Sequence, residues 1–142
     1  MADPNCIFCK ILEGTIPSVQ VYEDAHVVAF MDINPIAPGH VLVVPRHHCA
    51  NLLDAPPDVL AAVAEAAPKI ARGLLKATRG EGFNFFQFNG ACSGQEVMHL
   101  HFHIIPRRPG DGVRFGWTRR KYAEGEMAAL GARVRHTIGD EP

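Results

Sequence analysis

The stretch Met98-His99-Leu100-His101-Phe102-His103-Ile104-Ile105-Pro106 carries a histidine at every second position. Strict alternation of polar and apolar residues is the period of a β-strand, whereas a helix would spread the three rings around its axis. At about 3.3 Å per residue, successive histidines stand roughly 6–7 Å apart on one face. The intervening Leu100, Phe102 and Ile104 then face the core. A row of imidazoles at this spacing suits either a phosphate group or a metal ion.

Working outward, the chain alternates between strand and helix patterns. Apolar or β-branched runs predict four more strands, over residues 19–22, 26–31, 40–45 and 83–88. Apolar residues at every third or fourth position predict a main helix over 57–77, which begins with proline and which Pro68 should kink or divide. Short and weaker helices are expected near 6–12 and over 122–137. This order predicts an α+β fold: a five-stranded antiparallel sheet with the helices gathered on one side.

Composition narrows the class of protein. The 142 residues suit a single domain, and a formal net charge of −1 gives no electrostatic case for binding nucleic acid or an anionic membrane. No apolar run approaches the roughly 20 residues of a membrane span, and residues 1–5 do not resemble a signal peptide, so a cytoplasmic protein is expected. From Arg107 onward, the sequence contains eight basic and five acidic residues. That tail is either a solvated basic face or an aid to an anionic ligand.

A glycine-punctuated loop, Asn89 to Val97, lies directly before the histidines. Such loops can direct several backbone N–H groups at one anion, which favours a phosphate-handling site. The residues alone leave a rival open, a zinc hydrolase in which all three histidines bind the metal. A third hypothesis is a nucleotide-binding regulatory module with little turnover.

Residues 94–106 resemble the defining motif of the histidine triad (HIT) family. The segments 32–35 and 38–45 and the pair Ile7-Phe8 also match, and the likeness is to the small bacterial, Hint-like members. The resemblance implies a HIT-like α+β fold that pairs as a homodimer through about residues 57–88. It also implies one domain over 1–142, with its parts at 1–15 (zinc-binding segment), 16–108 (core) and 109–142 (C-terminal extension).

The resemblance implies an enzyme that attacks the α-phosphate of a purine nucleotide. His101 matches the family nucleophile, and His103 a catalytic and phosphate-binding position. The expected substrates are nucleoside 5′-phosphoramidates or mixed anhydrides, cleaved through a nucleotidyl-histidine intermediate. A dinucleoside polyphosphate is the alternative substrate. A hydrogen bond from one nitrogen of the His101 ring to a backbone carbonyl would leave the other nitrogen free to attack.

The expected substrate contacts come from several segments. Asp32 matches a ribose-binding carboxylate, although it could simply cap the turn at Asn34-Pro35. Glu96 stands where many members have Ser or Thr, so only its backbone N–H is expected to contact the substrate. Phe88 replaces a polar residue, which makes Asn89 the expected side-chain contact to phosphate. The remaining candidates are the orienting His40, the backbone near Gln95 and Val97, and an apolar base pocket of Ile7, Phe8, Ile11, Phe30 and Ile33.

Cys6-x-x-Cys9 has the spacing with which two thiolates bind one tetrahedral ion, although two ordinary buried thiols are the alternative. The resemblance supplies the partners, since several bacterial HIT proteins carry a Cys2His2 zinc site that matches His48 and His99. His47 is an alternative to its neighbour. On this interpretation the zinc is structural, and His101 stays free of metal.

Overall fold

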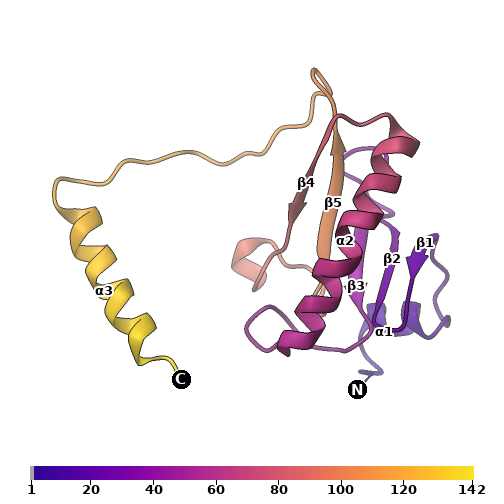
Figure 1. Cartoon of the computed structure of the whole chain (residues 1–142), viewed down its shortest axis with the longest axis horizontal. Coiled ribbons are helices and arrows are strands. Elements are labelled where there is room, and N and C mark those ends of the chain that lie inside the picture. Colours follow the sequence, from indigo (N-terminus) through magenta and orange to yellow (C-terminus); the bar gives the residue numbers. More distant parts are fainter. Residues whose placement is uncertain (1) are drawn as a thin grey trace.

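The computed structural model describes residues 2–142, and over that range it contains one antiparallel sheet of five strands in the order β1-β2-β3-β5-β4 (Figure 1). The predicted fold class is therefore confirmed. The elements in chain order are α1 (Ile7–Leu12), β1 (Gln20–Glu23), β2 (Val27–Met31), β3 (Val41–Pro45), α2 (Pro57–Thr78), β4 (Gly82–Phe86), the 3-10 turn η1 (Ala91–Ser93), β5 (Phe102–Arg107) and α3 (Glu126–Asp140).

Helices cover both faces of the sheet, not one face as the element order predicted. Helix α2 packs over the face that holds Val27, Val43 and Ile104. Helix α1 packs with the alternate residues of the same strands, such as Phe30 and Leu42, on the opposite face (Figure 1). The reason lies in β2 and β3, where nearly every residue is apolar and buried. Because successive side chains point to opposite faces, such strands need cover on both.

Helix α2 continues through Pro68 from Pro57 to Thr78, so the expected division of the helix is wrong. Proline lacks the N–H that would bond the carbonyl one turn earlier. Here that carbonyl belongs to Ala64, and both Ala64 and Pro68 are exposed. Water can therefore satisfy the freed carbonyl, and the helix keeps its buried stripe of Val63, Ala67 and Ile70.

The histidine run enters the sheet later than its alternation predicted. Strand β5 begins at Phe102, which pairs with Val43, and His99 and His101 precede it. Before that point the chain leaves the ladder and Leu100 N–H donates to the carbonyl of Cys49, beyond the end of β3 (2.8 Å). The alternation of sides is nevertheless kept, because Phe102 and Ile104 pack in the core on the α2 side, whereas His99 and His101 contact Phe8 on the α1 side.

Helix α3 stands apart from the sheet at the end of an extended segment (Figure 1). It begins at Glu126, after Gly125, and not at residue 122 as predicted. Gly125 adopts φ +76°, a left-handed conformation that ends the preceding turn. None of the helices found over residues 2–142 combines the length and apolar character that a bilayer span requires.

Candidate active site and metal centre

His101 presents one free ring nitrogen to a cavity. Its Nδ1–H donates to the backbone carbonyl of His99 (2.6 Å), as the sequence led us to expect, so the lone pair of Nε2 is left for chemistry. The ring is 8 % exposed and packs edge-on against Phe8, with centroids 5.0 Å apart. Burial lowers the pKa of His101, which the carboxylates of Asp32 and Glu96 partly oppose. The imidazole is therefore neutral near pH 7 and able to act as a nucleophile.

His103 is oriented by a chain of hydrogen bonds through His40. The N–H of Ile36 donates to His40 Nδ1 (3.0 Å), which assigns the His40 proton to Nε2. That Nε2–H donates to His103 Nδ1 (2.9 Å), so the remaining proton of His103 lies on its Nε2. Burial and the neighbouring imidazoles lower the pKa of His103 to about 4. His103 thus offers a fixed N–H donor from a neutral ring.

Phe86 holds His103 from its other side, and the sequence alone did not single it out. The two rings stack with centroids 4.7 Å apart and an interplanar angle of 13°. The register of the β4–β5 hairpin would have indicated this contact, because it pairs Phe86 directly with His103. Stacking from β4 and hydrogen bonding from His40 therefore fix the plane of this ring.

Two adjoining cavities meet at the histidines. The smaller, of about 180 Å³, is lined by Phe86, Phe88 and Gly94 together with polar groups that include His40. The larger, of about 250 Å³, is lined mostly by apolar side chains and contains the whole predicted base pocket, which is Ile7, Phe8, Ile11, Phe30 and Ile33. The residues common to both cavities are Asp32, Glu96, His101 and His103. This arrangement offers a flat apolar compartment next to a polar one, as a nucleotide requires.

Asp32 caps the turn that follows it and also lines the candidate site. Its Oδ1 accepts a hydrogen bond from Asn34 N–H (2.8 Å), which caps the turn. Its Oδ2 lies 3.6 Å from His40 Nε2, and the residue lines both cavities. One carboxylate oxygen is thus tied to the backbone while the other faces the site.

Asn89 and Gln95 do not line either cavity; their side chains brace the loop instead. Asn89 Oδ1 accepts from Leu52 N–H and from Gln87 Nε2, both at 2.8 Å. Gln95 is buried, its Nε2 donates to Ala50 O (2.6 Å) and its Oε1 accepts from Gly90 N–H (2.8 Å). The structure therefore brings the other predicted substrate residues together without these two side chains.

The backbone of the same loop faces the site at Glu96 and Val97. Val97 lines the larger cavity and Glu96 lines both. Among residues 2–142, no protein acceptor is found for the N–H of either residue, whereas Gln95 N–H donates to Gly90 O (3.2 Å). Two backbone donors therefore remain for an anion at the junction of the cavities.

Cys6, Cys9, His48 and His99 place their ligand atoms within 4.8 Å of one another. His99 Nδ1 lies 3.4 Å from Cys6 Sγ, and His48 Nδ1 lies 3.4 Å from Cys9 Sγ and 3.1 Å from His99 Nδ1. Around a tetrahedral zinc ion, nitrogen and sulfur ligands stand about 3.6 Å apart and two nitrogens about 3.3 Å apart. His99 Nε2–H also donates to Pro45 O (2.8 Å), the kind of support that zinc-binding histidines receive. The donor set fits zinc.

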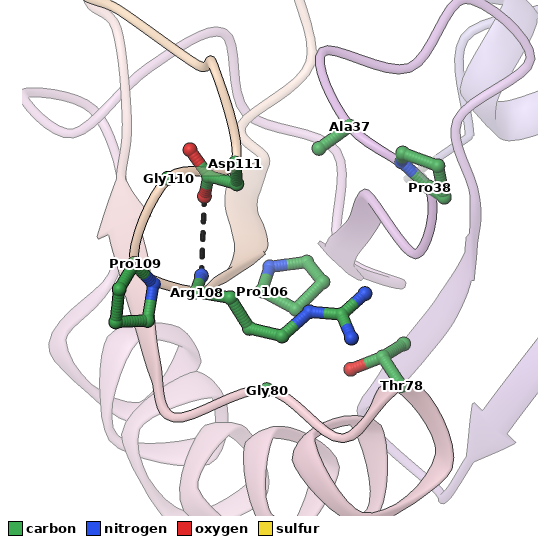
Figure 2. Close-up of a pocket in the computed structure, with 9 residues that line it drawn as sticks. All are labelled: Ala37, Pro38, Thr78, Gly80, Pro106, Arg108, Pro109, Gly110 and Asp111. Carbon is green, nitrogen blue, oxygen red and sulfur yellow. Dashed lines mark hydrogen bonds between the residues drawn. The ribbon is translucent and has the colours of Figure 1, made fainter.

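A second cluster of possible ligands within residues 2–142 is Asp32, His40 and His103. His101 belongs to neither cluster. The geometry therefore does not favour a single ion bound by all three alternating histidines, which was the rival hypothesis from the sequence. A further cavity of about 420 Å³ lies elsewhere, at the C-terminal end of α2, where Figure 2 shows Arg108 extending into it.

Comparison with known proteins agrees with this geometry. The HIT domain model matches residues 13–110. The chain belongs to the HIT family. A HIT-like protein of Methanocaldococcus jannaschii is 50% identical over 113 residues, which are 78% of this chain and 87% of that protein. The adenosine 5′-monophosphoramidase of Candida albicans is 42% identical over 118 residues, covering 80% and 78%. The adenylylsulfatase of Arabidopsis thaliana is 41% identical over 107 residues, covering 75% of this chain and 54% of that protein.

Solved HIT structures extend the likeness to most of the chain. A crystal structure from Streptococcus mutans superposes with a TM-score of 0.90 at 36% identity, over 96% of this chain and 87% of that one. A zinc-bound histidine triad protein from Mycobacterium smegmatis superposes with a TM-score of 0.75 at 33% identity, over 96% and 98%. The crystal structure of this relative therefore contains zinc.

Proposed function

We propose that this chain is a HIT-type nucleotide hydrolase that cleaves purine nucleoside 5′-phosphoramidates or related mixed anhydrides. Curated relatives from Candida albicans and two other yeasts, 37–44% identical, are named adenosine 5′-monophosphoramidases, which supports a hydrolase. The observation that carries the proposal is the Nδ1–H bond of His101 to His99 O (2.6 Å). It holds a neutral imidazole with its second nitrogen directed at a cavity that also holds a fixed donor.

The reaction proceeds in two displacements. His101 Nε2 attacks the α-phosphorus, the bond from phosphorus to the leaving group breaks, and the leaving amine takes a proton from solvent. The phosphorylated ring carries a positive charge, which strengthens its Nδ1–H bond to His99 O. Water then attacks phosphorus and gives up a proton to solvent, the bond to Nε2 breaks, and a nucleoside monophosphate departs and leaves His101 neutral. Covalent catalysis of this kind replaces one difficult displacement by two easier ones.

The remaining groups bind and orient the nucleotide. His103 Nε2–H and the N–H groups of Glu96 and Val97 donate to the phosphate oxygens as negative charge develops. The free carboxylate oxygen of Asp32 accepts from the ribose hydroxyls, and the apolar cavity holds the purine. The side chain of Asn89 stabilises the loop through its hydrogen bonds with Leu52 and Gln87.

Zinc bound by Cys6, Cys9, His48 and His99 would act as a structural cross-link between the N-terminal segment and the catalytic one. Its thiolate ligands require a reducing compartment, which is consistent with a cytoplasmic enzyme. We also propose a homodimer that pairs through α2 and β4. Strand β4 lies at one edge of the sheet, and Phe83 and Phe85 on it are each 44 % exposed. An apolar sheet edge of this kind favours pairing with a second copy.

The test is turnover of an adenosine 5′-phosphoramidate, followed by chromatography of the released AMP. His101→Ala should abolish turnover. A His26→Ala control should leave turnover unchanged, because His26 is exposed and lines neither cavity. Equal rates in wild type and His101→Ala would refute the proposal. Tight nucleotide binding without turnover by the wild type would instead identify a regulatory module.

A further inference from the structure

The two cavities of the site carry two carboxylates and no permanent positive charge. Asp32 and Glu96 each line both cavities, and of residues 2–142 no lysine or arginine lines either one. Of the imidazoles that share the site, His40 and His101 are buried and His103 is half-buried. Burial lowers the pKa of each ring, so all three are neutral near pH 7. The site is therefore electrostatically negative before a nucleotide, itself an anion, enters.

The basic residues of the chain lie elsewhere. Arg108 extends into the separate cavity at the C-terminal end of α2 (Figure 2), where its backbone N–H donates to Asp111 Oδ2 (3.1 Å). The other basic residues between β5 and α3 are all exposed on the extended segment, and they are Arg114, Arg119, Arg120 and Lys121. The tail thus adds no cation to the cavities described.

Glu96 occupies the position from which a charge would act on the leaving group. A phosphate at the junction is contacted by the residues that both cavities share. In an in-line displacement, the leaving group departs from the side of phosphorus opposite His101. Glu96 lines this junction and is itself exposed, so its carboxylate is free to face the departing group.

We propose that Glu96 selects substrates by the charge of the leaving group, a proposal that rests on the hydrolase function above. Leaving amines that carry an additional ammonium group are favoured, and leaving groups that carry a carboxylate, sulfate or further phosphates are disfavoured. For effective dielectric constants between those of bulk water and a protein surface, a single charge pair about 6–8 Å apart changes a rate by about 2- to 100-fold. This selection separates phosphoramidates of diamines from adenylyl sulfates and dinucleoside polyphosphates as substrates.

The experiment uses three adenosine 5′-phosphoramidates of similar size, whose amines are butylamine, 1,4-diaminobutane and 4-aminobutanoate. The quantity compared is kcat/KM in wild type, in Glu96→Gln, and in Glu65→Gln as a control that removes an exposed carboxylate from α2. Wild type should prefer the cationic over the anionic substrate by at least tenfold. Glu96→Gln should reduce that ratio by at least tenfold, and Glu65→Gln should leave it within about twofold.

A second measurement needs no variant. Raising the salt concentration from about 10 mM to about 1 M shortens the Debye length from roughly 30 Å to roughly 3 Å, so the wild-type ratio should shrink toward one. If all three substrates turn over but the ratio is unchanged in Glu96→Gln and insensitive to salt, charge selection is overturned while the hydrolase function stands. If wild type cleaves none of the three, both proposals fall.

Discussion

Replacing His40 by alanine tests whether His40 determines which ring nitrogen of His103 carries the proton. His40 Nε2–H donates to His103 Nδ1 (2.9 Å), and Ile36 N–H fixes the His40 ring (3.0 Å). Without that donor, His103 is free to carry its proton on Nδ1. The lone pair of Nε2 would then face the phosphate oxygens, which repels them and removes a donor from the transition state.

The size of the effect follows from what each substitution removes. Loss of a donor that stabilises a transition-state oxygen costs about 10²–10³ in kcat. Loss of a group that only orients such a residue costs about 10–100-fold. We therefore expect His40→Ala to lower kcat by about 10–100-fold, and His103→Ala to lower it further. His40 is 2 % exposed and its ring packs against His103, so its removal also empties buried space and destabilises the fold by about 1–3 kcal/mol.

The decisive assay is a double-mutant cycle on single-turnover rates, with the folded fraction of each variant measured by circular dichroism. If His40 acts through His103, the double variant His40→Ala/His103→Ala is no slower than His103→Ala alone. If the fold-decrease in rate of the double variant equals the product of the two single-variant decreases, the reasoning is refuted. His40 would then contribute to catalysis independently of His103.

Three further predictions concern protons, metal and ribose. Because burial lowers the pKa of the proposed nucleophile His101 below its usual value of about 6.5, kcat should hold as the pH falls from 7 to about 6.5 and decline only at lower pH; a half-loss above about pH 6.5 would contradict this. Burial and the neighbouring imidazoles lower the pKa of His103 to about 4. The unfolded ring, with a pKa of about 6.5, binds its proton first, so stability should also decline as pH falls between about 6.5 and 4. Cys6→Ser should lose its zinc, and with it the roughly 4 kcal/mol of folding stability that zinc at 1,000 times its Kd supplies. The expected readouts are a lower Tm and loss of metal by elemental analysis, while cleavage persists below the new Tm. A variant that keeps its zinc would exclude Cys6 as a ligand. Asp32→Asn should raise KM for a ribonucleotide substrate by about 10-fold but hardly change it for the 2′,3′-dideoxy analogue. An equal rise for both substrates would show that Asp32 does not bind the ribose hydroxyls.

The sequence predicted the elements whose pattern is local. Alternation over the histidine run, apolar runs at β2 and β3, and the helical stripe of α2 each reflect the position of side chains relative to one backbone. It failed where the answer depends on distant partners. Strand β5 starts late because Leu100 bonds Cys49, and α1 crosses to the second face because β2 is apolar on both sides.

The candidate site shows the same division. The motif located His101 and the apolar pocket, but it did not show that the Asn89 side chain bonds Leu52, 37 residues away in the chain. The pairing of His40 with His103 spans 63 residues, and the stacking of Phe86 depends on hairpin register. Such contacts have no local pattern, because only the folded sheet brings these residues together.

The three alternating histidines differ in which ring nitrogen the protein occupies, and this explains how one motif supports two chemistries. His99 Nε2–H is bound to Pro45 O, which leaves Nδ1 among the sulfur atoms. His101 Nδ1–H is bound to His99 O, which leaves a lone pair on Nε2. His103 Nδ1 accepts from His40, which leaves an N–H on Nε2. The proposed metal ligand, nucleophile and hydrogen-bond donor thus follow from three different partners of one side chain type. Because the His99 carbonyl that orients His101 belongs to a candidate zinc ligand, the metal centre and the nucleophile share one residue, and displacement of His99 would disturb both.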